Sequence, residues 1–266
     1  MKLEVLVSTM NREDLSLVNK MNIKSDVLIV NQSPTSDYDF EIKKEFNIRM
    51  LSFKEKGLSK SRNRALQNAQ GDICLIADDD VRYHDDYVDK VINAHTEYAD
   101  YDIIVFAVPT TNIDREKKYY TRVKRMGYVR SLKIASFEIS FKRKSIIDNK
   151  ILFNEEFGAG SGQYSMGEEN IFIYQCLKKG LKILYLPIEI GLVTHEESTW
   201  FFGYNQKYFI DKGACYAAMS PKYAYLIAWQ FGLRKYLNYK KEVNFIDAII
   251  NMQKGIRGYN SKRGFN

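Results

Sequence analysis

Three consecutive carboxylates, Asp78-Asp79-Asp80, follow an apolar run at residues 73–77. Adjacent like charges repel one another, so a strand end near a core holds them at a cost in stability unless a cation neutralises them. Carboxylate oxygens suit Mg²⁺ or Mn²⁺, and these ions in turn suit diphosphates. The alternative is a solvated acidic turn that caps the next helix, where Asp is favoured.

Alternating apolar runs and helical segments must position these acids. Runs that predict strands lie at residues 3–8, 26–31, 48–52 and 73–77. Residues 58–69 predict a helix between the last two, because their apolar side chains share one face. This alternation indicates the α/β class, with a mostly parallel, Rossmann-like sheet and helices on both faces. Ligands of such sheets bind at the carboxyl ends of strands, where the acidic triplet and Thr9, Asn11 and Arg12 lie.

The remaining chain continues the alternation and then becomes helical. We expect helices at 85–97 and 170–179, and strands at 102–108, 136–141, 182–186 and 190–194. A basic, aromatic stretch occupies 117–133, and no strand pattern follows residue 205. The expected organisation is a catalytic domain over residues 1–205, with a nucleotide-binding half at about 1–108 and an acceptor half at about 109–205, followed by a basic, aromatic, helical region at 206–266.

Composition narrows the class of protein. The 266 residues include 45% apolar residues, 40 Lys and Arg, and 33 Asp and Glu, for a net charge of +7. Three cysteines without CxxC spacing argue against a disulfide framework and a structural zinc site. The first residues predict a strand and not a signal peptide, and no apolar run reaches the roughly 18 residues of a membrane span, so we expect a cytoplasmic protein.

The positive charge is concentrated at the C-terminus. Residues 230–266 hold eight Lys or Arg and two Asp or Glu, which is +6 of the total +7. The preceding segment, AYLIAWQFGLRKYL, mixes bulky apolar residues with terminal Arg-Lys. A helix of this kind can lie on an anionic membrane, so we expect peripheral contact with the inner face of the plasma membrane through residues 224–266. The alternative is a helix packed on the catalytic domain or on a second copy in a homo-oligomer.

The ordered motifs resemble the family 2 glycosyltransferases with the GT-A fold. The resemblance rests on GLSKSRNRAL at residues 57–66, Gly71-Asp72, an apolar strand and then Asp-x-Asp. Gly167-Glu168-Glu169 matches the acidic pair of that family, and His195 lies where the family often has a histidine that contacts metal or diphosphate. The resemblance covers about residues 3–200 and implies a GT-A domain with a helical C-terminal appendage.

The resemblance also implies roles on the donor side. The expected donor is a nucleotide sugar of the UDP-sugar type, which would bind with Mn²⁺ or Mg²⁺ as cofactor. Asp80 would bind the metal with Asp78 and His195, and Asp78 would also contact the ribose or sugar. Asp79 would orient its neighbours. The other residues expected at the donor are Arg62 at its sugar or diphosphate, and Thr9, Asn11, Arg12 and Asn31 around its nucleoside.

Glu169 is the base that the resemblance implies, deprotonating an acceptor hydroxyl that attacks the anomeric carbon with inversion. Burial and neighbouring carboxylates should raise its pKa. The family more often has Asp at this position, so Glu168 stays open as an alternative base. Helix N-terminal charge, worth roughly 0.3–1 kcal/mol per residue, is the non-catalytic interpretation of the pair. The implied acceptor is a saccharide, lipid-linked in some members, as in bacterial capsular or cell-surface polysaccharide synthesis.

Three other functions compete with this interpretation. A sugar-nucleotide nucleotidyltransferase would need a glycine-rich, basic loop after the first strand, and STMNRED is not one. A nucleic-acid-binding module could use the basic stretch at 117–133, but it leaves both acidic clusters unexplained, and we expect no nucleic-acid partner. A non-catalytic membrane-surface protein would tolerate loss of Asp80. His84 and His95 have no partners at ligand spacing, and we expect both at the surface.

Overall fold

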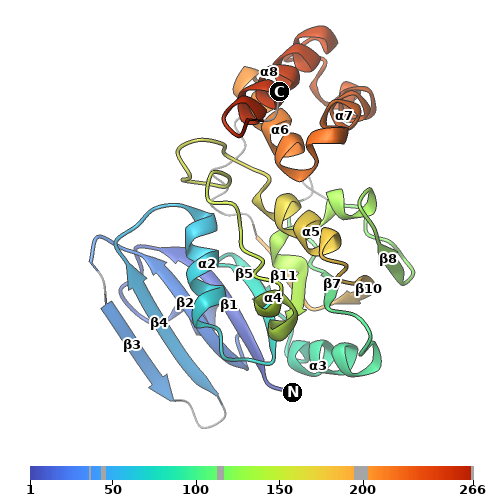
Figure 1. Ribbon diagram of the computed structural model, residues 1–266. Helices are drawn as coiled ribbons and strands as arrows, with labels where there is room; N and C mark the ends of the chain where they lie inside the picture. The colour runs from blue at the N-terminus through green and yellow to red at the C-terminus, as the bar shows by residue number, and fades with distance from the viewer. Residues whose placement is uncertain (36, 43–45, 113–116, 195–202, 265–266) are drawn as a thin grey trace.

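The computed structural model describes residues 1–35, 37–42, 46–112, 117–194 and 203–264. Within them, a nine-stranded sheet forms the centre of the molecule (Figure 1). Its strands are β1 (Leu3–Met10), β2 (Asp26–Gln32), β3 (Asp37–Ile42), β4 (Asn47–Phe53), β5 (Ile73–Asp78), β7 (Ile103–Ala107), β8 (Lys124–Met126), β9 (Ile139–Lys142) and β10 (Ile183–Glu189). They lie in the order β3-β4-β2-β1-β5-β9-β7-β10-β8.

The direction of the strands confirms the expected α/β class. Strands β4, β2, β1 and β5 are parallel neighbours, and β7 and β10 pair in parallel. Strand β9 lies antiparallel between β5 and β7, while β3 and β8 are antiparallel at the two edges. The register pairs Thr9 with Asn31 and Ser8 with Asp78, so the predicted donor-side residues meet at the carboxyl ends of β1, β2 and β5.

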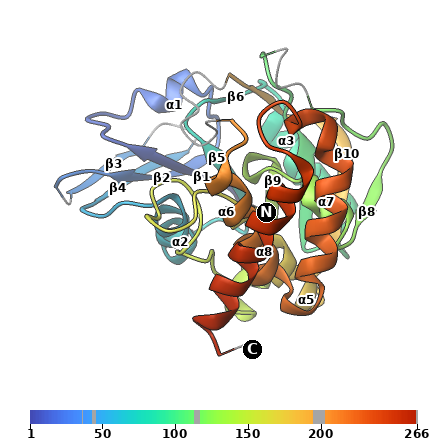
Figure 2. The same cartoon turned by 90° about the horizontal axis from the view of Figure 1, so that it is seen from above.

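Helices cover both faces of the sheet, as Figure 2 shows from above. The helices of this part are α1 (Leu17–Lys20), α2 (Leu58–Asn68), α3 (Tyr87–Glu97), α4 (Arg143–Asp148) and α5 (Glu168–Lys178). Leu66 of α2 and Phe172 of α5 belong to one apolar core, whereas Leu17 of α1 and Val91 of α3 belong to the core on the opposite face. The valine- and isoleucine-rich strands are buried from both sides for this reason.

Three helices follow the sheet, as the absence of a strand pattern predicts. They are α6 (Gln206–Met219), α7 (Ala224–Tyr239) and α8 (Phe245–Ser261). Helices α6 and α8 cross closely, since a Cβ on Gly213 would lie 1.9 Å from the carbonyl oxygen of Met252. Phe157 and Ile171 of the preceding region pack in the same apolar core as these helices. In the described part of the chain, no helix combines the length and apolar character that a membrane span needs.

Short elements depart from the sequence prediction. The expected strand at 136–141 begins as a 3-10 turn, η3 (Ser136–Glu138), because the Glu138 carboxylate accepts a 2.9 Å bond from the backbone N–H of Ala135. A two-stranded sheet of β6 (Val81–Tyr83) and β11 (Gly191–Val193) follows the acidic triplet. We did not predict β3, β6 or β8. Three residues are too few for β6 or β8 to show an alternating pattern.

Candidate active site

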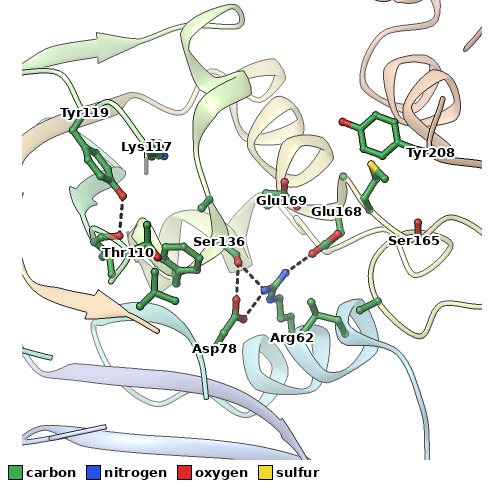
Figure 3. Close-up of a pocket in the computed structure, with 18 of the residues that line it drawn as sticks. Arg62, Asp78, Thr110, Lys117, Tyr119, Ser136, Ser165, Glu168, Glu169 and Tyr208 are labelled. Atoms are coloured by element: carbon green, nitrogen blue, oxygen red, sulfur yellow. Dashed lines mark hydrogen bonds and ion pairs between the residues drawn. The ribbon is translucent and has the colours of Figure 1, made fainter. Parts of the chain in front are cut away.

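A cavity of about 600 Å³ opens where β5, α2, η3 and the first turn of α5 meet the C-terminal helices. Figure 3 shows its charged lining, with Asp78, Arg62 and Glu168 directed toward one another and Glu169 nearby on α5. Asp78 ends β5 and Glu168 begins α5, so the two acidic motifs that are 90 residues apart in sequence reach the same cavity. Asp78 lies at the carboxyl end of its strand, as the sequence predicts, and Glu168 reaches the cavity from the N-terminus of a helix.

Arg62 of α2 joins the two acidic motifs. One terminal nitrogen donates to Oε1 of Glu168 at 2.9 Å, and the other donates to Oδ1 of Asp78 at 2.8 Å and to Oγ of Ser136 at 2.7 Å. The side chain is 3% exposed and lies over the ring of Phe153. A buried guanidinium without these carboxylates would be strongly unfavourable, so the three charged groups stabilise one another. We predicted contact between Arg62 and the donor, but its described partners are protein groups.

The two glutamates have different environments. Glu168 is buried and bound to Arg62, whereas Glu169 lines the cavity without an ion pair in the described residues. Burial and the negative charge of Glu168 raise the pKa of Glu169 to about 8, and the charges of Lys212 and Arg62 oppose this rise. A carboxylate with such a pKa holds a proton tightly enough to act as a general base near neutral pH.

The acidic triplet is divided among different partners. The Asp79 carboxylate accepts bonds from Oγ1 of Thr9 at 2.5 Å and from Arg12 at 3.1 Å. The backbone oxygen of Asp80 accepts from the N–H of Thr194 at 3.2 Å, which fixes the triplet against β11. Within the described ranges, no three His, Cys, Asp or Glu side chains gather as a metal-binding group. His195 lies outside the described residues.

The turn that follows β1 is held by hydrogen bonds to the end of β2. Asn11 has a left-handed φ of +52°, and its N–H donates to the carbonyl of Gln32 at 2.9 Å. The amide of Asn31 accepts from the Arg12 N–H at 3.0 Å and donates to the Arg12 carbonyl at 2.9 Å. Asn31 is 1% exposed, so its amide holds this turn in place. Asn11 and half-buried Arg12 are thereby presented at the sheet edge.

The family model for glycosyl transferase family 2 matches residues 9–163, more than half of the chain. The chain belongs to glycosyl transferase family 2. It is therefore a glycosyltransferase, and the nucleotidyltransferase and the two non-catalytic interpretations are set aside. The sequence resemblance to this family is confirmed. A search of curated proteins by sequence found no match.

Solved structures show the same GT-A fold as this family 2 member. The crystal structure of S. aureus TarS 1–349 in complex with UDP-GlcNAc matches with a TM-score of 0.67 and 15% identity, over 99% of this chain and 92% of that chain. The complex of the same protein with UDP matches over the same shares with a TM-score of 0.62 and 15% identity. Because both matches include the C-terminal helices, the GT-A fold with a helical C-terminal region is confirmed.

Several cavity residues of this glycosyltransferase were not predicted from the sequence. The cavity wall includes Ser136, Tyr208 and Lys235, from η3, α6 and α7. Lys117 donates 2.6 Å bonds to both carboxylate oxygens of Glu138, which is 1% exposed. Ser136, Tyr208 and Lys235 are far apart in the sequence, and no motif spacing links them. The only available signal was the basic stretch at 117–133, which begins at Lys117.

The expectation of a surface position for His95 was wrong. His95 is 1% exposed, and its Nε2 lies 2.8 Å from Oγ of Ser140 on β9. Burial lowers its pKa to about 4, so the ring is neutral at physiological pH and packs as part of the interior. His84 is half-buried, and its Nε2 lies 2.8 Å from Glu189.

Proposed function

We propose that the enzyme transfers a sugar from a UDP-sugar to a hydroxyl of a saccharide acceptor, with inversion at the anomeric carbon. The observation that carries this proposal is the cavity in which Arg62 ties Asp78 to Glu168, with Glu169 beside them. It brings a donor-side carboxylate and a base with a raised pKa to one space. Family membership supplies the reaction class, and this arrangement supports the roles of the residues.

The donor site in this proposal lies at the ends of β1, β2 and β5. Thr9, Asn11 and Arg12 flank the nucleoside, Asn31 fixes their turn, and Asp79 orients Thr9 and Arg12. Asp78 and Arg62 lie at the sugar end, where both line the cavity. TarS, the similar structure, was crystallised with UDP and with UDP-GlcNAc, which favours a uridine diphosphate donor here.

The metal of this proposal is Mg²⁺ or Mn²⁺, held by Asp80 with Asp78 and His195. In the described residues the carboxylates of Asp78 and Asp79 already accept bonds from protein groups, and no three-residue ligand cluster forms. The support for the ion is the donor set, because Asp78 and Asp80 offer two carboxylates. Mg²⁺ takes one or two carboxylates and completes its shell with substrate phosphates. When bound, such an ion neutralises charge on the departing diphosphate.

Glu169 is the general base in this proposal. Its carboxylate takes the proton of the acceptor hydroxyl while the oxygen attacks the anomeric carbon opposite the diphosphate. Glu168 is engaged by Arg62 and orients the first turn of α5, so it fits a positioning role better than the role of base. A single displacement from the opposite face inverts the anomeric configuration.

The setting in this proposal is the synthesis of a bacterial capsular or cell-surface polysaccharide at the inner face of the plasma membrane. One face of α7 supports membrane contact, because Leu226, Trp229, Leu233 and Leu237 are 45–75% exposed along it. The segment contains no Asp or Glu, and Lys240 and Lys241 follow it. Residues 1–205 would perform the transfer, and residues 206–266 would join the enzyme to its acceptor and membrane.

This membrane contact has a direct test. The Leu233→Ser/Leu237→Ser double variant should sediment less with anionic vesicles than the wild type, and neutral vesicles should bind neither protein. Equal sedimentation of both proteins would exclude this face. A shift of the wild type to a dimer in solution, lost in the double variant, would instead assign the face to a second copy.

Release of UDP from a panel of UDP-sugars tests the proposed reaction. The wild type, Asp80→Asn and Glu169→Gln would be compared with Mn²⁺, with Mg²⁺ and with a chelator, in the presence of mixed lipid-linked acceptors. We expect one donor to be consumed only by the wild type and only with metal. Equal turnover in the chelator, or full activity of Asp80→Asn, would contradict the proposed metal and donor roles.

A further inference from the structure

Helix α7 presents a lysine to the cavity from its inner face. Ala228 and Phe231 are buried on this face, and Lys235 follows them at helical spacing. Lys235 is half-buried and lines the same cavity as Glu169 and Tyr208. A lysine in this position brings positive charge to the wall of the cavity that the C-terminal helices form.

Three further cations lie near enough to Lys235 to act on its charge. Half-burial lowers the pKa of Lys235, and the like charges of Arg234, Lys133 and Lys212 lower it further. In the described parts of the chain, none of these four residues forms an ion pair with a carboxylate within 4 Å. Lys117 on the other wall differs, because both oxygens of buried Glu138 neutralise it.

The cluster lies on the side of the cavity that holds the proposed base. Lys212 lies close enough to Glu169 to lower its pKa, and also acts on Lys235. The proposed base is therefore next to the basic cluster, whereas Thr9, Asn11 and Arg12 of the proposed donor site are not among the residues that line the cavity. Lys133 ends the basic stretch at 117–133, which carries seven Lys or Arg and no acid, and which the donor site does not use.

We propose that Lys235, with Lys133 and Arg234, binds a phosphate group of the acceptor, close to the hydroxyl that Glu169 activates. Lys235 lies half-buried in the cavity wall, and Lys133 and Arg234 are exposed cations near it. This arrangement favours an anionic ligand, since a neutral saccharide would leave the repulsion among the three cations in place. Two sources supply such a phosphate: the diphosphate that links a saccharide to a lipid, or a phosphodiester within a polymer. This inference rests on the proposed function and names the chemical class of its acceptor.

Binding with the donor site saturated by UDP and Mg²⁺ tests the inference. The probes are farnesyl diphosphate, a glycerol phosphate hexamer and the neutral octyl glucoside. We expect the wild type to bind one anionic probe at least about 10-fold more tightly than Lys235→Gln does, with affinity falling as salt rises. Octyl glucoside should not distinguish the two proteins. The anionic probe that binds identifies the source of the phosphate.

A matched variant and a separate assay distinguish failure of this inference from failure of the proposed function. Lys241→Gln removes an exposed lysine just beyond α7 and should bind every probe as the wild type does. Equal binding of the anionic probes by the wild type and Lys235→Gln, or no binding of either probe at low salt, would overturn the inference. Binding of UDP with Mg²⁺ in the absence of any probe reports the donor site alone, so failure of the wild type to bind UDP would count against the proposed function instead.

Discussion

The sulfur of Cys215 occupies the space that a side chain on Gly167 would need. A Cβ at Gly167 would lie 2.4 Å from this sulfur, and the backbone there has a φ of +94°. Gly167 is the N-cap of α5 and precedes Glu168 and Glu169 directly. Helix α6 therefore sets how closely the proposed base can approach the C-terminal helices.

The Gly167→Ala variant should be less stable than the wild type and should transfer sugar more slowly. Both the positive φ at this position and the contact with Cys215 oppose a side chain. We expect a loss of about 2–4 kcal/mol in unfolding free energy, with reduced transfer as α5 shifts. Gly180→Ala is the matched control at the other end of α5, where φ is +81° and a Cβ would meet open space. If chemical denaturation shows an equal loss of unfolding free energy in both variants, the side chain of Cys215 moves aside without an energetic cost.

The Glu169→Gln variant should transfer sugar roughly 10²–10⁴ times more slowly while still binding UDP, because it removes only the base.

The stability of the same variant tests the burial of Glu169. The pKa of Glu169 is raised from 4.5 to about 8, so its ionisation opposes folding, and this penalty grows as pH rises between these values. The glutamine variant should therefore melt no lower than the wild type at pH 9. A lower melting temperature there would contradict the burial of this carboxyl group.

The pH profile of transfer should report Glu169. The base acts when deprotonated, so kcat/KM should rise with pH up to a midpoint near 8 and level off above it. The charge of Lys212 lowers this pKa and that of Glu168 raises it. Lys212→Met should then move the midpoint to higher pH, Glu168→Gln should move it to lower pH, and Lys212→Arg should leave it in place. Identical midpoints in all variants would exclude Glu169 as the titrating group.

Arg62→Met should destabilise the fold by about 3–5 kcal/mol, because it leaves Glu168 buried and Asp78 partly buried without a cation. Arg64→Met on the same helix is the control. Arg64 is 43% exposed and pairs with Glu55, and surface pairs of this kind contribute about 0–1 kcal/mol. Urea denaturation of both variants measures the difference. If Arg62→Met loses no more unfolding free energy than Arg64→Met, water replaces the arginine as the partner of Asp78 and Glu168.

Local pattern predicted much of the fold and the two acidic motifs that line the candidate site. The strand ending at Asp78 and the helix opening at Glu168 were visible because apolar periodicity and acidic residues coincide there. Family resemblance then placed both motifs in one reaction, and the described structure brings them to one cavity. These features depend on neighbours in the sequence, which a single chain displays directly.

The unpredicted features depend on contacts between distant residues. Nothing near Arg62 in sequence shows that its guanidinium would bind Ser136, and the burial of His95 depends on its pairing with Ser140 of β9. Lys235 belongs to a basic tail whose charge alone did not distinguish an inner from an outer helix face. Packing decides each of these cases, and packing follows from the whole fold.

The contact between Gly167 and Cys215 has a consequence for how this enzyme can be recombined with relatives. Helix α6 packs against the cap of the helix that carries the proposed base, and α7 brings Lys235 to the same cavity. A chimera that exchanges residues 206–266 alone would pair a foreign helix with this cap. Acceptor preference and catalytic rate should therefore be inherited together, and functional chimeras should need a junction before Gly167.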